Sequence, residues 1–194
     1  MNIRYLQIPY SILTLLNWKI LYYQKFKVDS FINVFIGSNC ELLMAGNNPL
    51  FQINGRLVLR RDVCININGG SLILGPKVFF NRGCSINCQE SIEIGNSCIF
   101  GENVMIYDHD HNFREEGSFQ SQGFSREKIV IEDNVWVGSS SIILKGSYIG
   151  KNSVIAAGSV VRGTIPSDTL FYNKRENVFK TISIRKNEDV PRDV

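Results

Sequence analysis

The chain contains only two histidines, His109 and His111, and they stand two residues apart in the segment Asp108-His109-Asp110-His111. A histidine that titrates near neutral pH is suited to general-base catalysis, and a neighbouring carboxylate can orient its ring. Two histidines flanked by carboxylates are also ligands that zinc accepts. A third interpretation is a solvated polar loop that has no catalytic or metal-binding role. Which of the three interpretations is favoured depends on the secondary-structure elements around this segment.

Length and composition describe an ordinary globular chain. The 194 residues are 44% hydrophobic and 20% charged, which suits one domain with its own core. No apolar run reaches the roughly 18 residues that span a bilayer. A net charge of +3 is too small to predict a nucleic-acid partner. The N-terminus lacks a secretory-signal pattern, so we expect a cytoplasmic protein.

Apolar residues recur every six positions in the second half of the chain. The large positions are Ile131, Val137, Ile143, Ile149, Ile155 and Val161. Four residues after each stands a small or β-branched residue: Val135, Ser141, Ser147, Ser153, Ser159 and Ile165. Neither a helix nor a half-buried strand has this period. Gly138 and Gly150 follow large positions, where we expect a tight corner to need a permissive backbone.

Three such hexads fit one coil of a three-sided prism. Each side is a short strand, and coils stack about 4.8 Å apart with parallel pairing, so stability comes from stacking. The same phase recurs upstream, and it places Cys40, Cys84 and Cys98 at the small inward position. The chain has five cysteines, an odd number, and no signal peptide, which argues against a disulfide framework. It has no CxxC pair, which argues against a four-cysteine zinc site. We therefore expect structural thiols.

The polar segment 107–128 interrupts the repeat and is too long for a corner. We interpret it as a loop extruded from the coil, a common place for functional residues. The expected organisation is an N-terminal helical cap or peripheral segment over residues 1–30, a β-helix domain over 31–166, and a C-terminal strand and tail over 167–194.

The segments IGNSCIFGENVMIYDHDH (94–111) and IEDNVWVGSSSIILKGSYIGKNSVIAAGSVVRGTIP (131–166) resemble the hexapeptide-repeat acyltransferases. The nearer relatives are galactoside and maltose O-acetyltransferases and enzymes that modify polysaccharides. The resemblance is strong over residues 72–166. It implies an all-β fold, a left-handed parallel β-helix that forms a homotrimer with active sites between subunits. It also implies acetyl-CoA as the acyl donor, with no metal.

The resemblance implies roles for the residues around the loop. His111 falls on the family's catalytic histidine, so we expect it to be the general base. Asp108 and His109 are expected substrate contacts, and either Asp108 or Asp110 would orient an imidazole. Asn81 matches a position that contacts the acceptor sugar, although a corner asparagine also makes local backbone hydrogen bonds. Gln89 replaces a carboxylate of the galactoside enzymes, which argues against the same small-sugar acceptor.

Further residues match the donor side of the family's site. Ser139 and Ala157 match contacts of the pantetheine arm, although hexads need small residues in any case. Trp136, at an expected outward corner, would line the wall beside the reacting groups or contact another subunit. Arg162 and Lys180 match cations for the phosphates of the donor.

Residues 5–27 are rich in Leu, Ile and aromatic residues, and Pro9 is suited to open a helix. The positive excess of the chain lies within residues 1–30. A helix that caps the open edge of the β-helix would look like this, and so would an interfacial helix beside anionic lipid. We expect the cap, with peripheral contact at the inner face of the membrane as an addition.

These observations predict an acetyl-CoA-dependent O-acetyltransferase that acts directly on a hydroxyl of a saccharide, such as a cell-surface polysaccharide or its precursor. The first alternative is an N-acetyltransferase of an amino sugar or sugar nucleotide, for which the fold and donor site would be the same. The second is a β-helical scaffold without catalysis, which would have no reason to interrupt its repeat with a histidine-bearing loop.

Overall fold

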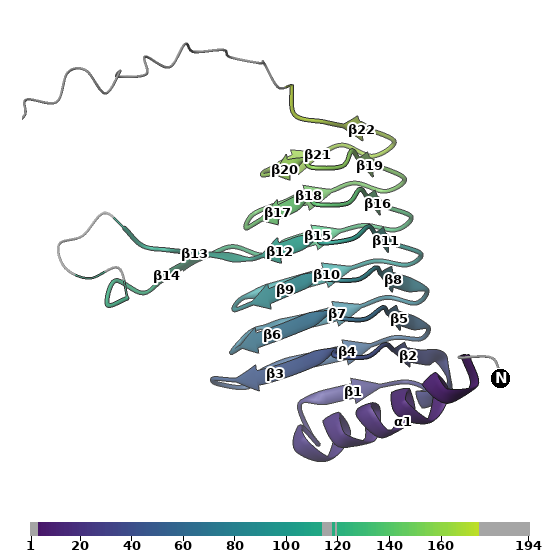
Figure 1. Cartoon of the computed structure of the whole chain (residues 1–194). Coiled ribbons are helices and arrows are strands. Elements are labelled where there is room, and N and C mark those ends of the chain that lie inside the picture. The colour runs from purple at the N-terminus through teal and green to yellow at the C-terminus, as the bar shows by residue number, and fades with distance from the viewer. Residues whose placement is uncertain (1–3, 114–117, 119, 175–194) are drawn as a thin grey trace, which may run out of the picture.

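The computed structural model describes residues 4–113, 118 and 120–174. Short parallel strands wind into a three-sided β-helix, and a single long helix, α1 (Arg4–Leu21), lies at its N-terminal end (Figure 1). Each side of the prism is one sheet, and the sheets are named A, B and C here. A short 3-10 helix, η1 (Phe31–Asn33), precedes the first strand of sheet B.

Each sheet takes one strand from each coil. Sheet A consists of β1 (Phe26–Val28), β4 (Leu50–Ile53), β7 (Ser71–Leu74), β10 (Ser91–Ile94), β15 (Ile129–Ile131), β18 (Tyr148–Ile149) and β21 (Thr164–Ile165). Sheet B consists of β2 (Val34–Ile36), β5 (Leu57–Leu59), β8 (Val78–Phe80), β11 (Ile99–Phe100), β16 (Trp136–Val137), β19 (Val154–Ile155) and β22 (Leu170–Phe171). Sheet C consists of β3 (Glu41–Ala45), β6 (Cys64–Asn68), β9 (Ser85–Cys88), β12 (Met105–Tyr107), β17 (Ile142–Leu144) and β20 (Val160–Val161).

The register agrees with the predicted stacking of coils. Ile94 of β10 lies beside Leu74 of β7 on one side and Ile131 of β15 on the other, all in parallel pairs. The predicted class, a left-handed parallel β-helix with an N-terminal helical cap, is confirmed. Strand pairing extends beyond residues 31–166 at both ends, where β1 pairs with β4 and β22 with β19. These strands of three and two residues are too short to show the hexad in the sequence.

The hexad positions form the core of the prism. All six large positions from Ile131 to Val161 are buried, and stacked aromatic rings, Phe80 and Phe100, extend the column with centroids 4.3 Å apart. The small positions are buried as well, and the hydroxyls of Ser141, Ser147 and Ser153 donate to backbone carbonyls. Ser153 Oγ, for example, lies 2.8 Å from the Pro166 carbonyl oxygen. A buried hydroxyl without such a partner would destabilise the fold.

Gly138 and Gly150 are required for a reason other than the one expected. Positive φ at the corners is carried instead by residues such as Asn103 (56°) and Ser140 (58°). A Cβ on Gly138 would lie 2.5 Å from the Ala157 nitrogen, and a Cβ on Gly150 would lie 2.4 Å from the Ser167 nitrogen. The next coil therefore passes too close for any side chain, and glycine is needed for stacking rather than for turning.

The helix α1 covers the first coil. Leu15 and Trp18 are buried against the prism. Ser11 Oγ accepts a hydrogen bond from the Ile36 N–H at 2.6 Å and donates to the Val34 carbonyl at 3.3 Å. These bonds occupy backbone groups of β2, the first strand of its sheet, as an edge requires. Among the residues described, no helix is long and apolar enough to cross a membrane.

Candidate active site

Both histidines lie on a hairpin that leaves the prism between sheets C and A. The strands β13 (His109–His111) and β14 (Phe124–Arg126) pair antiparallel, with His109 opposite Arg126 and His111 opposite Phe124. The hairpin projects sideways from the stacked coils (Figure 1). The predicted interruption of the repeat at 107–128 is therefore an extruded loop, and its base is a regular ribbon.

The carboxylate at the root of the hairpin is fully buried. Asp108 has no exposed surface, and its oxygens accept hydrogen bonds from the backbone N–H groups of Gln89 (2.8 and 3.0 Å) and Glu90 (2.8 Å). Its Oδ1 also lies 2.9 Å from Nδ1 of His109, whose side chain is only 15% exposed. In the described chain Asp108 is a buried anchor that positions the hairpin root and orients His109. Its expected contact with the substrate stays a prediction.

His111 has a different environment. Its side chain is exposed, and its ring packs on Phe124 with centroids 4.4 Å apart and planes inclined by 44°. It borders a pocket of about 440 Å³ together with Asp110, Asn112, Phe113, Ser125, Lys145 and Arg162. The histidine predicted to act as the base is therefore the one that faces open space, whereas His109 is held by a carboxylate.

A buried lysine connects the hairpin to the prism. Lys145 follows β17, is 6% exposed, and places Nζ 2.7 Å from Ser125 Oγ and 3.3 Å from Asp110 Oδ2. One contact is on β14 and the other on β13, so a single side chain holds both strands. Lys145 was not among the residues predicted from the sequence. Its signal was a lone cation inside an apolar hexad, which periodicity alone does not distinguish from a surface lysine.

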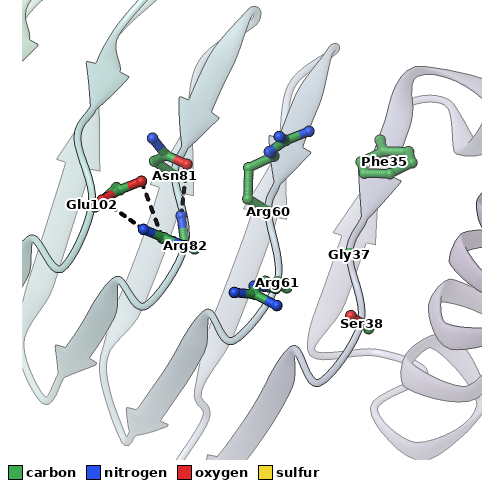
Figure 2. Close-up of a pocket in the computed structure, with 8 residues that line it drawn as sticks. All are labelled: Phe35, Gly37, Ser38, Arg60, Arg61, Asn81, Arg82 and Glu102. Atoms are coloured by element: carbon green, nitrogen blue, oxygen red, sulfur yellow. Dashed lines mark hydrogen bonds and ion pairs between the residues drawn. The ribbon is translucent and has the colours of Figure 1, made fainter. Parts of the chain in front are cut away.

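Three of the expected acceptor and donor residues lie at another edge of the prism. Asn81, Ser139 and Ala157 all lie in corners between sheets B and C, each on a different coil. Ser139 Oγ accepts a hydrogen bond from the Glu102 N–H at 3.1 Å, which leaves the serine proton available to donate. Asn81 borders a separate pocket of about 340 Å³ (Figure 2). Within one chain, the lining of this pocket shares no residue with that of the His111 pocket.

The remaining expected contacts are distributed over the molecule. Trp136 is 55% exposed and lies in strand β16 of sheet B rather than at a corner, because the corner of this coil falls at residues 138–140. Arg162 borders the pocket of His111. Lys180 lies outside the described residues. No group of three or more His, Cys, Asp or Glu side chains that could hold a metal ion occurs in the described part of the chain.

The cysteines are free thiols in apolar surroundings. Cys40, Cys84, Cys88 and Cys98 are buried, and Cys64 is half-buried. Burial raises the pKa of Cys84 and of Cys98 to about 11, and it raises the pKa of Cys88 further, with the Asp108 charge adding to the effect. A thiol with a raised pKa is a poor nucleophile at neutral pH, which agrees with the structural role expected from the repeat.

Comparison with known proteins gives the same family as the repeat. Residues 128–163 match the family model described as bacterial transferase hexapeptide (six repeats). A galactoside O-acetyltransferase of Lactococcus lactis is 34% identical over 107 residues, which are 55% of this chain and 51% of that protein. The putative lipopolysaccharide biosynthesis O-acetyl transferase WbbJ of Escherichia coli is 29% identical over 119 residues, 57% of this chain and 61% of that protein.

Solved structures show the same coil. A maltose O-acetyltransferase from Clostridium difficile has a TM-score of 0.51 at 28% identity, over 86% of this chain and 75% of that one. The N-acyltransferase AntD from Bacillus cereus has a TM-score of 0.62 at 16% identity, over 78% and 80% of the two chains, and shows the fold alone. The chain spans about half the length of the first curated relatives that it matches. The resemblance to hexapeptide-repeat acyltransferases predicted from the sequence is thereby confirmed, and the coils over residues 128–163 match the bacterial transferase hexapeptide.

Proposed function

We propose that this protein transfers the acetyl group of acetyl-CoA to a hydroxyl group of a saccharide, with His111 as the general base. The observation that carries the proposal is the placement of His111. It stands exposed beside a pocket of about 440 Å³, on a hairpin that a buried lysine fixes to the coil. The O-acetyltransferases among the relatives support the same reaction class.

The proposed reaction is a direct transfer. An imidazole nitrogen of His111 takes the hydroxyl proton while the oxygen attacks the carbonyl carbon of the thioester. The tetrahedral intermediate then collapses, the C–S bond breaks, and the imidazolium returns the proton to the departing thiolate. General-base assistance contributes roughly 10² to 10⁴ in rate. No acyl-enzyme is needed, and the buried cysteines are poorly suited to form one.

The acetyl-CoA site is proposed for the edge that carries Ser139 and Ala157. Small residues there let the thin pantetheine arm approach the backbone, and the Ser139 hydroxyl would donate to the developing oxyanion, an interaction worth about 3 to 4 kcal/mol. Trp136 would line the wall of this site, and Arg162, which borders the His111 pocket at the other edge, would supply a cation for the donor from a neighbouring copy. A hexapeptide-repeat acetyltransferase from Vibrio cholerae has been solved with acetyl-CoA, at a TM-score of 0.52 and 23% identity.

The distance between the two edges supports a site shared by subunits. His111 leaves the prism between sheets C and A, whereas Asn81 and Ser139 lie between sheets B and C. A second copy packed against this chain would bring its own hairpin to the edge that carries Asn81. We therefore propose a homotrimer with active sites between subunits, as the family resemblance implies.

Sheet B offers a surface for that assembly. One outward position of each of its strands forms a column in register, and all seven members are apolar: Phe35, Val58, Phe79, Ile99, Trp136, Val154 and Leu170. Sheet A carries Lys27, Gln52 and Glu93 at the equivalent outward positions. A continuous apolar column on one face is typical of a protein–protein interface.

The helix α1 has an exposed apolar face that the prism does not cover. Its residues are Tyr10, Ile12, Leu13, Leu16, Ile20 and Leu21. Asn17 is also exposed on this side of the helix, and Lys19, a cation of the same helix, is half-buried. The exposed cations Lys25 and Lys27 follow directly. Apolar residues beside basic ones suit the interface of an anionic bilayer. We propose a cytoplasmic protein that contacts the inner face of the membrane through α1.

The experiment that tests the function measures acetyl-CoA-dependent thiol release with capsular and exopolysaccharide repeat units as acceptors. We expect His111→Ala to lose at least about 10² in turnover while it keeps its melting temperature. Turnover near that of the unchanged protein would reject His111 as the base. A product that releases acetate in mild alkali is an ester. An alkali-stable product would replace O-transfer by N-transfer, and a protein that does not bind acetyl-CoA in calorimetry would be a scaffold.

A further inference from the structure

A second pocket, of about 340 Å³, opens at the corner between sheets B and C on the first coils. Successive coils contribute Gly37 and Ser38, then Arg60 and Arg61, then Asn81 and Arg82, with Glu102 on the next coil and Phe35 at the side. Figure 2 shows the arginines on neighbouring turns of the coil, on the same side of the prism as Asn81. The repeat thus brings three guanidinium groups to one edge, although Arg60 and Arg82 are more than twenty residues apart in the sequence.

The charges of this pocket are unequally paired. Arg82 is bound to Glu102 through two contacts, Nε to Oε1 at 3.0 Å and an Nη to Oε2 at 3.3 Å. Arg61 has only Asp62, with Nε 3.6 Å from a carboxylate oxygen. For the guanidinium of Arg60, the described residues provide no hydrogen bond or ion pair. Two cations therefore remain weakly compensated at the mouth of the pocket.

Stacking places Arg82 of one coil beside Arg60 and Arg61 of the coil before it. Adjacent coils are about 4.8 Å apart, so like charges at the same corner repel one another. Glu102 relieves the repulsion at Arg82 alone. Guanidinium groups bind carboxylates and phosphates through paired, planar hydrogen bonds that a neutral sugar does not offer. The pocket is therefore suited to a ligand that carries a negative charge.

Asn81 links this pocket to the proposed reaction, because it is the expected acceptor contact and borders the same cavity. We infer that Arg60 and Arg61 bind a carboxylate or phosphate group of the acceptor, so that the substrate is an acidic saccharide. The claim that the bound anion belongs to the acceptor rests on the proposed function. The claim that the pocket binds an anion does not.

The test compares three probes of similar size: glucuronic acid, glucose 1-phosphate and glucose. Binding is measured by ligand-observed NMR, without acetyl-CoA. We expect at least one acidic probe to bind about tenfold or more tightly than glucose, and the preference to weaken at high salt, which screens charges. The carboxylate and phosphate arms show which anion is preferred. Equal binding of all three probes would overturn the inference.

Variants assign the effect to this corner. Arg60→Gln together with Arg61→Gln should remove the preference for the acidic probe and leave glucose binding unchanged. Arg56→Gln is the matched control, because Arg56 is exposed on the same coil but at another corner, and it should bind like the unchanged protein. Glu102→Gln should strengthen binding, since it releases Arg82. An acidic preference that survives in the double variant would refute the assignment.

The same double variant separates this inference from the reaction. If anion binding depends on Arg60 and Arg61 but no acetyl transfer occurs, the assignment of the anion site is supported and the proposed function is wrong. If neutral saccharides are acetylated as efficiently as acidic ones, and the double variant has an unchanged KM, the function stands and the inference fails.

Discussion

Asp108 and His109 are bound to each other, with carboxylate Oδ1 2.9 Å from ring Nδ1, although His111 is the histidine that faces the pocket. The other contacts of the carboxylate are backbone N–H groups of the neighbouring coil. Asp108 therefore fixes the point at which the hairpin leaves the prism. His109 is a part of that anchor, and it holds the ribbon on which His111 is presented.

We expect Asp108→Asn to destabilise the protein by about 1 to 3 kcal/mol, because an amide NH₂ would oppose backbone donors in a buried place. Urea unfolding followed by tryptophan fluorescence measures the change. Asp62→Asn is the control, since Asp62 is exposed and its side-chain contacts, with Arg61 and Asn39, lie at the surface. In activity assays, His109→Gln should lose less turnover than His111→Ala. The reverse order would assign the general base to His109.

The repeat allowed most of the fold to be predicted, because each hexad position has one physical requirement. The column from Ile131 to Val161 must be apolar to fill the prism, and the small positions must fit beside it. The role of Asp108 could not be predicted in the same way. Its partners are backbone groups of Gln89 and Glu90, and backbone N–H groups have no signature in a sequence.

The role of Lys145 could not be predicted from the sequence either, and the contacts of this residue lead to a second prediction. Lys145→Met should keep the apolar stem but release Ser125 and Asp110, so the hairpin would be cleaved faster by a protease and turnover would fall about tenfold or more. Lys145→Arg should recover part of the loss. Lys151→Met is the control, because Lys151 is exposed at a corner. A hairpin of unchanged protease resistance would show that Lys145 does not anchor it.

The buried thiols predict a loss of stability in alkali. Burial raises the pKa of Cys84 and Cys98 from 9.0 to about 11, so the folded protein holds these protons more tightly than the unfolded chain. Between pH 9 and 11 the unfolded chain loses them first, and the free energy of unfolding must fall as pH rises. The variant Cys84→Ala/Cys98→Ala should show a shallower fall in that interval. Equal slopes would contradict the raised pKa values.

The apolar column of sheet B predicts how subunits associate. Ile99→Glu and Val154→Glu each place a charge in the middle of this column, and we expect both variants to dissociate into monomers in analytical ultracentrifugation. Val130→Glu, at an outward position of sheet A, should leave the assembly intact. Dissociation should also abolish turnover if the site is shared. A monomeric unchanged protein would refute the interface.

The exposed face of α1 predicts binding to lipid. We expect the protein to sediment with phosphatidylglycerol vesicles and not with phosphatidylcholine vesicles, because Lys25 and Lys27 favour an anionic surface. Replacing Leu13, Leu16 and Ile20 by serine should abolish sedimentation without loss of folding, since all three side chains are exposed. Serine at Val160, an exposed apolar residue far along the coil, is the control. If the triple variant instead loses only concentration-dependent self-association, the face binds a second copy of this chain and the membrane proposal is wrong.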